Sequence, residues 1–330
     1  MTRTSPKKSG AWNARIAWIP DRTIQPPRPT MNRVFTPPTV DGVSASSLVL
    51  PAGPWLRLID YLAHRLPAVS REDWLARMQA GDVLDEQGLP LGPEARYRKQ
   101  TRVYYYRRLA YEAPIPFDET VLFQDEWIVV ADKPHFLPVV PSGRYVQETL
   151  LVRLKRKLGI DTLTPMHRID RDTAGLVLFS IQPQTRAAYQ HLFRDKTISK
   201  QYEAMAPTRT DLRWPYTHRS RLQESAQFMA MEEVPGPINA ETVIDVLESR
   251  GPLSRYRLQP ITGQKHQLRA HMSALGMPIV NDLYYPVLQP DHIPDYSKPL
   301  KLLAKSVAFT DPITGQARTF QSQRSLDWPT

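Results

Sequence analysis

Cysteine is absent from this chain of 330 residues. Its absence excludes disulfide bonds, catalytic thiolates, and zinc or iron–sulfur sites with thiolate ligands. Long hydrophobic runs are also missing, because charged residues or proline interrupt each apolar stretch before it could span a bilayer. The first ten residues, MTRTSPKKSG, lack the apolar segment of a secretory signal. We therefore expect a cytoplasmic protein that does not bind a membrane.

Motifs for cofactors, metals and an activated serine are absent too. The 14 glycines are scattered and form neither GxxxxGKS/T nor GxGxxG. No HExxH and no GxSxG sequence occurs. His266 and His271 lie five positions apart on a predicted helix, so they share no face for chelation and are expected to pack or to form hydrogen bonds. The sequence predicts neither a metal ion nor an organic cofactor.

Acidic residues are outnumbered, with 33 Asp and Glu against 43 Lys and Arg, a net charge of +10 and a pI near 9.7. Such an excess favours a polyanionic partner, because each cation that meets a phosphate releases condensed counterions. Nucleic acid is the leading candidate. A basic protein without such a partner is the alternative, and charge alone does not exclude it.

Composition and periodicity divide the chain into four parts. The first forty residues hold seven prolines, and seven Lys and Arg against one Asp, which is typical of a disordered basic arm. Next, WLRLIDYLAHRL ends at Pro67, SREDWLARMQAG starts with Ser70 as an expected N-cap, and DVLDEQGLPL predicts a short hairpin. The expected parts are an arm (1–50), a small helix–helix–hairpin module (51–112), a catalytic domain (113–325) and a tail (326–330).

The segment at 95–111, ARYRKQTRVYYYRRLAY, interleaves six Lys and Arg with aromatics. Arginine beside aromatic rings suits phosphate contact and base stacking. A β-strand with a solvated basic face explains the pattern equally well. Arg98, Lys99 and Arg102 are the candidate RNA-binding residues here.

The remaining chain alternates strand and helix patterns. ETLLVRLKRKLG (148–159) and KHQLRAHMSALG (265–276) have helical periodicity and end in glycine, whereas GLVLFS (175–180) predicts a buried strand. The irregular order favours an α+β fold with a mixed, mainly antiparallel sheet and flanking helices.

One stretch concentrates charge before that strand. In MHRIDRDTAGLVLF (166–179), Asp170 lies in a loop that could hold it rigidly yet accessibly. An arginine, either Arg168, Arg171 or the distant Arg269, could keep its carboxylate ionised. Taken alone, an Arg–Asp–Arg turn is more often structural.

Five segments in order resemble the RluA-type pseudouridine synthase family. They are FQDEWIVVADKPHFLPVVPSG (123–143), HRIDRDTAGLVLFS (167–180), KQYEAM (200–205), TGQKHQLRAHMSALGMPIVNDLYY (262–285) and FTDPITG (309–315). The resemblance covers roughly residues 115–325. The upstream module looks like a small RNA-binding module shared with a ribosomal small-subunit protein.

The resemblance implies an RNA isomerase that needs no cofactor and converts uridine to pseudouridine after base flipping, on rRNA more than on tRNA. Asp170 would act at the ribose, Tyr202 would pack on the base and assist loss of the C5 proton, and Arg269 would pair with Asp170. Arg168 would fill the gap left by the flipped base, and His167 and Lys200 are further candidate RNA contacts. We expect RNA as the partner and a monomeric enzyme.

Several residues depart from the family pattern without removing Asp170, Tyr202 or Arg269. They leave the substrate open, because several lie in expected RNA-contacting loops. The departures are Phe136, Val140, Ala174, Gln264, Lys265 and Asn281, and LLAKS in place of LHA.

Two other function classes remain as alternatives. A non-catalytic RNA-binding or ribosome-assembly protein could keep the same fold. A carboxylate glycosidase would need two cooperating acids. Asp172 could be offered as the second, but we expect it to cap or pair locally.

Overall fold

A computed structural model describes residues 35–109, 111–226, 230–289 and 294–329. The chain divides after Phe35, and Thr36–Thr330 form one unit. No helix in the described ranges is long and apolar enough to cross a membrane.

The small module is a three-stranded antiparallel sheet with two helices. The predicted N-cap is confirmed, since the Ser70 side chain accepts a hydrogen bond from the Asp73 amide at 3.0 Å. The expected hairpin is reduced to one bridge between Leu84 and Pro90, and the strand there pairs with a later one. The elements are β1 (Ser46–Val49), α1 (Leu58–Arg65), α2 (Arg71–Gln79), β2 (Val83–Leu84) and β3 (Arg102–Tyr105).

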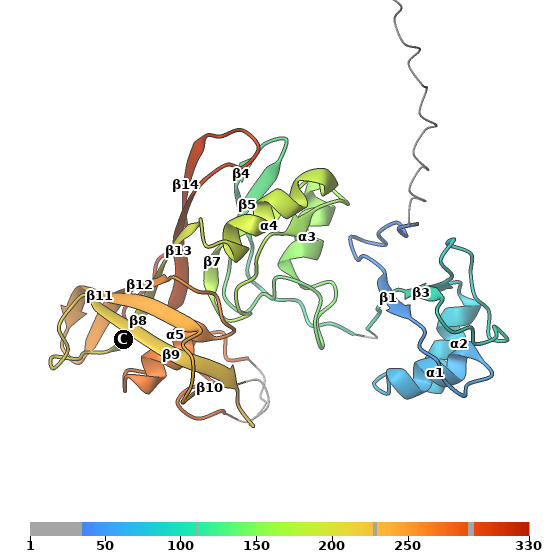
Figure 1. Ribbon diagram of the computed structural model, residues 1–330, viewed down its shortest axis with the longest axis horizontal. Helices are drawn as coiled ribbons and strands as arrows, with labels where there is room; N and C mark the ends of the chain where they lie inside the picture. Colours follow the sequence, from blue (N-terminus) through green and yellow to red (C-terminus); the bar gives the residue numbers. More distant parts are fainter. Residues whose placement is uncertain (1–34, 110, 227–229, 290–293, 330) are drawn as a thin grey trace, which may run out of the picture. The chain divides into compact units, whose positions relative to one another are not determined.

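The rest of the chain builds an 11-stranded sheet with few helices (Figure 1), so the predicted α+β class with a mainly antiparallel sheet is confirmed. Its main path runs β10-β9-β11-β12-β8-β13-β7-β5-β4, and among the described strands only β13 and β7 pair in parallel. The strands are β4 (Thr120–Gln124), β5 (Ile128–Lys133), β6 (Thr164–Pro165), β7 (Ala174–Ser180), β8 (Ser199–Pro207), β9 (Tyr216–Glu224), β10 (Met231–Val234), β11 (Ala240–Arg250), β12 (Leu253–Pro260), β13 (Leu302–Thr310) and β14 (Ala317–Gln321). The helices are α3 (Leu150–Leu158), a 3-10 turn (Pro183–Thr185), α4 (Arg186–Arg194) and α5 (Gln267–Ala274).

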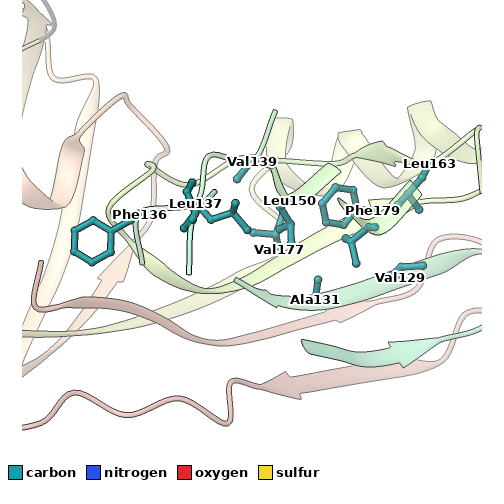
Figure 2. Close-up of a cluster of buried hydrophobic side chains, with 11 residues drawn as sticks. Val129, Ala131, Phe136, Leu137, Val139, Leu150, Leu163, Val177 and Phe179 are labelled. Carbon is teal, nitrogen blue, oxygen red and sulfur yellow. The ribbon is translucent and has the colours of Figure 1, made fainter. Parts of the chain in front are cut away.

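Strands β5 and β7 are buried along their whole length because helices cover both faces. Side chains alternate between the faces of a strand. Val129 therefore lies in one core with Leu150 of α3, and Figure 2 shows Leu150 close to Val177 of β7. The next residue, Val130, lies in another core with Leu192 of α4.

Helix α5 packs on the other half of the sheet (Figure 1). Leu268 and Met272 of α5 join a core with Ile244 of β11 and Leu258 of β12. This packing fixes α5, which carries Arg269, against β11 and β12.

Two of the expected segments contain residues that lie in packed parts of the structure. Most of the expected arm (1–50) lies outside the described residues, but Ser46–Val49 form β1, because Leu48 packs into the core of the small module. The expected tail (326–330) is anchored in its described part. Leu326 is buried, and Trp328 lies against the guanidinium groups of Arg250 and Arg255.

Gly175 is the second residue of β7 and lies at a point where no side chain fits. Its φ is +110°, and a Cβ atom there would lie 2.2 Å from the carbonyl oxygen of Ala304 on β13. Only glycine allows this approach, which brings β7 and β13 into their parallel pairing five residues after Asp170.

We predict that Gly175→Ala lowers the free energy of unfolding by about 3 kcal/mol, from the backbone clash and the unfavourable φ. Gly251→Ala is the matched control, because Gly251 has φ +57° with no atom near its missing Cβ. It should cost about 1 kcal/mol. Chemical denaturation measures both, and equal losses would contradict the packing argument.

Candidate active site

Asp170 lies in the loop between β6 and β7. The loop begins at Met166, whose amide donates to the Leu178 carbonyl, and it turns where the Thr173 amide donates to the Asp170 carbonyl at 3.2 Å. The Asp170 side chain keeps 29% exposure. It is therefore held by the sheet and still reachable from solvent.

Arg269 of α5 is the principal partner of that carboxylate. Its Nη1 donates to Asp170 Oδ2 at 3.1 Å. The other side of the guanidinium is occupied by Asp282, which accepts from Nε at 2.8 Å and from Nη2 at 2.6 Å. Arg269 is 1% exposed and the Asp282 side chain 0%, so the two charges depend on each other in the interior.

These charges set the protonation state of Asp170. Burial by itself would raise its pKa, but the positive charge of Arg269, the nearby His266 and the hydrogen bond from Arg269 together lower it below the ordinary value. His266 Nε2 lies 3.8 Å from Asp170 Oδ1. Asp170 is thus a carboxylate at neutral pH.

Tyr202 of β8 lines the same cavity as Asp170 and Arg269, which encloses about 510 Å³. Burial, followed by the charge of Asp170, raises the pKa of the Tyr202 phenol well above its ordinary value. The ring is therefore neutral in the resting protein and offers an aromatic wall beside the carboxylate.

The cavity wall also includes three of the predicted RNA contacts, His167, Arg168 and Lys200. Arg168 is exposed and has no hydrogen bond or ion pair with any described residue. Lys200 of β8 is half-buried and donates to the Thr262 carbonyl at 3.3 Å. Burial and then Lys196 lower its pKa.

His167 has a different environment from the one expected. Its Nε2 accepts a hydrogen bond from the Leu178 amide at 3.1 Å, and its ring stacks on Phe193 at 4.5 Å between centroids. Burial and then Lys200 lower its pKa to about 3. The ring is therefore neutral at pH 7 and its Nε2 is occupied by the backbone, so it carries no charge for an ion pair with a phosphate.

Arg171 and Asp172 brace the loop. Arg171 Nε donates to Asp172 Oδ1 at 2.8 Å, in agreement with the local pairing expected for Asp172. Lys133 is fully buried at the end of β5 and donates to the Arg171 carbonyl at 2.9 Å. Burial lowers its pKa to about 7 although Asp172 and Asp170 raise it.

The candidate residues of the small module line no part of this cavity. Arg98 and Lys99 are exposed, and Arg102 of β3 bonds to Ser47 at 3.2 Å. Of the neighbouring aromatics, Tyr104 and Tyr106 are buried. Among the described residues of the segment only Arg102–Tyr105 form a strand, and Tyr111 is 80% exposed, so the cations and Tyr111 remain accessible to a ligand whereas the rings of Tyr104 and Tyr106 do not.

Sequence reasoning gave no role to Asp282 or Tyr284, and it expected only packing or a hydrogen bond of His266. Asp282 closes the far side of Arg269, and Tyr284 lies 4.7 Å below its guanidinium. His266 is the N-cap residue of α5 and has φ +52°. The sequence does place an Asp and a Tyr shortly after the HQLR helix. Their spacing alone does not show that their partner is Arg269.

Two departures from the family pattern lie at positive φ, Phe136 at +67° and Asn281 at +63°. Asparagine tolerates this region, and its side chain donates to the Pro299 carbonyl at 3.0 Å. Phenylalanine is strained there. Its ring is held by Phe117 and Tyr296.

Known proteins resemble both the sequence and the fold. A family model described as RNA pseudouridylate synthase matches residues 127–274. The dual-specificity RNA pseudouridine synthase RluA of Haemophilus influenzae is 30% identical over 220 residues, which are 65% of this chain and 97% of that relative. Human pseudouridylate synthase RPUSD2 is 31% identical over 165 residues, which are 50% of this chain but 30% of that relative.

A solved structure, human RNA pseudouridylate synthase domain containing 1, superposes with a TM-score of 0.52. The match covers 65% of this chain and 86% of that one at 18% identity. At this identity the likeness concerns the fold alone.

Arg269→Met should lower the free energy of unfolding by about 3–5 kcal/mol, because Asp282 would remain buried without its partner. Adding Asp282→Asn should restore at least about 1 kcal/mol by removing that charge. Arg219→Met breaks an exposed pair with Glu241 and should cost less than about 1 kcal/mol. Urea denaturation of the wild type and the three variants measures these losses, and a loss for Arg269→Met no larger than for Arg219→Met would contradict the buried pairing.

Proposed function

Because the chain belongs to the RNA pseudouridylate synthase family, whose members are isomerases, we propose that it converts specific uridines of structured RNA into pseudouridine. The observation that carries the proposal is the ionised Asp170, which is held by Arg269 in a cavity that Tyr202 also lines. Such a cavity is large enough for one nucleoside.

Asp170 is the proposed catalytic residue. In the reaction the N1–C1′ bond of uridine breaks, the uracil turns within the cavity, and a C5–C1′ bond forms as the C5 proton leaves. The lowered pKa keeps the carboxylate charged, which suits both addition to C1′ and abstraction of the C2′ proton. Arg269 acts as a positioning residue, because it fixes one carboxylate oxygen and leaves the other free of it.

Tyr202 is proposed to pack against the uracil ring. Its raised pKa means that it reaches the base as a neutral phenol. Tyr202 does not start as a phenolate. For it to assist loss of the C5 proton, a separate base therefore has to take the proton of its phenol.

The uridine has to leave its helix to reach this cavity, at a cost of a few kcal/mol. We propose that Arg168 stacks in the vacated space, since its planar cation is exposed at the cavity and has no partner among the described residues. Lys200 is a second candidate contact, on the cavity wall.

We propose that the small module adds phosphate contacts through Arg98, Lys99 and Arg102. The first two side chains are exposed, and none of the three forms an ion pair within the described residues. Its resemblance to a ribosomal-protein module favours rRNA over tRNA as the substrate. The bacterial relative is a dual-specificity RNA pseudouridine synthase, so both RNAs belong in the assay.

Asp170→Asn should reduce tritium release from RNA labelled at uridine C5 by at least about 10³-fold, because the amide can neither add to C1′ nor take a proton. The assay uses rRNA and tRNA transcripts separately. Asp161→Asn is the matched control, since Asp161 is exposed and lies outside the cavity lining.

Two results would count against the proposal. Release by Asp170→Asn at the wild-type rate would remove Asp170 from its role. No release by the wild type from either RNA, despite measurable binding, would favour a non-catalytic RNA-binding protein on the same fold.

The double variant Arg98→Ser and Lys99→Ser should weaken RNA binding and reduce the slope of log K against log salt concentration by about 1 for each lost phosphate contact. Lys298→Ser, which removes an exposed lysine elsewhere, should leave the slope unchanged. Filter binding at several salt concentrations measures both. An unchanged slope in the double variant would assign the RNA contacts to other residues.

A further inference from the structure

Outside the catalytic cavity, three potential metal ligands meet between β9, β10 and α5. They are His218, Glu233 and His271, and one ligand atom from each lies within 4.8 Å of the others. His218 Nε2 is 2.7 Å from Glu233 Oε1, and His271 Nε2 is 4.0 Å from the same oxygen. None of the three lines the cavity that contains Asp170.

Sheet register explains why these residues converge. His218, Ser220 and Leu222 are alternate residues of β9, so their side chains share a face. Glu233 pairs with Leu222 in the β10–β9 ladder and therefore points to that face as well. His271 enters the same place from α5, where its Nε2 lies 3.1 Å from the Ser220 hydroxyl.

The buried histidine has the outer partner that metal-binding histidines usually have. His271 Nδ1 lies 3.0 Å from Thr242 Oγ1, which also receives a hydrogen bond from Gln267 Nε2 at 3.0 Å. In the Nδ1–H tautomer the ring donates to Thr242. The lone pair of Nε2 then faces Glu233 and Ser220, the arrangement in which a ligating imidazole is held.

We propose that His218, Glu233 and His271 bind a divalent transition-metal ion, with zinc as the expected ion, at a structural site that joins the β9–β10 hairpin to helix α5. Two imidazoles and one carboxylate suit Zn²⁺, whereas Mg²⁺ and Ca²⁺ prefer oxygen ligands alone. Tetrahedral coordination at bond lengths near 2 Å separates ligand atoms by roughly 3.4 Å. The present separations bracket that value, so small side-chain rotations suffice.

Accessibility agrees with entry of an ion from one side. The His271 side chain is 0% exposed, while those of His218 and Glu233 are 14% and 27% exposed. The buried ligand is thus fixed by the helix, and the two outer ligands can adjust. Solvent or the Ser220 hydroxyl is available for a fourth position.

The site would stiffen the surroundings of Arg269, which lies two residues before His271. β10 already has a second link to the catalytic region, since the Met231 amide donates to the Tyr285 hydroxyl at 2.7 Å. That hydroxyl lies 3.3 Å from His266 Nδ1. A metal bound here would fix β10 and α5, so that Met231 and His266 would be held on the two sides of the Tyr285 hydroxyl. The ion itself would not touch the substrate.

The test uses the full chain without a histidine tag, stripped with a chelator and then titrated with Zn²⁺ in equilibrium dialysis with elemental analysis. We expect one equivalent per chain, and an increase in melting temperature on binding. Co²⁺ in place of Zn²⁺ should give the visible absorption of a tetrahedral site. His218→Gln and Glu233→Gln should each weaken binding by more than about 100-fold, and Thr242→Val by about 10-fold.

His64→Gln removes an exposed histidine of α1 and should bind Zn²⁺ like the wild type. The outer ligands are chosen for substitution because they are partly exposed, and near-ultraviolet circular dichroism in chelator verifies that both variants fold. Absence of stoichiometric binding by the wild type would overturn the proposal. Unchanged Zn²⁺ binding in His218→Gln and Glu233→Gln would also overturn it. An equal loss of binding in His64→Gln would do the same.

Discussion

The rest of the site depends on the two ion pairs of the buried Arg269 guanidinium. A cation that is 1% exposed is tolerable only because Asp282 occupies one side of it and Asp170 the other. The two carboxylates are not equivalent. Asp282 is wholly buried and accepts two hydrogen bonds from the guanidinium, whereas Asp170 accepts one and keeps contact with solvent. Asp282 therefore fixes the arginine, and the arginine fixes and ionises the catalytic carboxylate.

Three sets of packing contacts bring these groups together. Gly175 lets β7 approach β13, and β13 pairs with β8, which carries Tyr202. The core beneath α5 places Arg269 over the same region. Lys133, buried at the end of β5, holds the carbonyl of Arg171 and so fixes the loop immediately after Asp170. Together these contacts position the side chains of Asp170, Tyr202 and Arg269, which lie far apart in the sequence.

Much of this was predictable from the sequence, and what was missed has a common physical cause. Hydrophobic periodicity and caps predicted the α+β class and helices such as 148–159, where Thr149 and Gly159 do cap α3. Five ordered motifs indicated Asp170, Tyr202 and Arg269. The partner of the buried face of Arg269 was missed, because which carboxylate meets a cation is decided by tertiary packing. The neutral state of His167 was missed for the same reason, since burial and a backbone hydrogen bond leave no trace in residue order.

The central claim is that Arg269 keeps Asp170 ionised against the effect of its burial. The direct measurement is the pKa of Asp170 from the pH dependence of its carboxyl ¹³C shift, in aspartate-labelled wild type and in Arg269→Met, with Asp170→Asn used for assignment. We expect a pKa below the ordinary 3.8 in the wild type and above it in the variant, where burial is no longer opposed by the arginine. A wild-type value at or above 3.8, or one that Arg269→Met leaves unchanged, would contradict it.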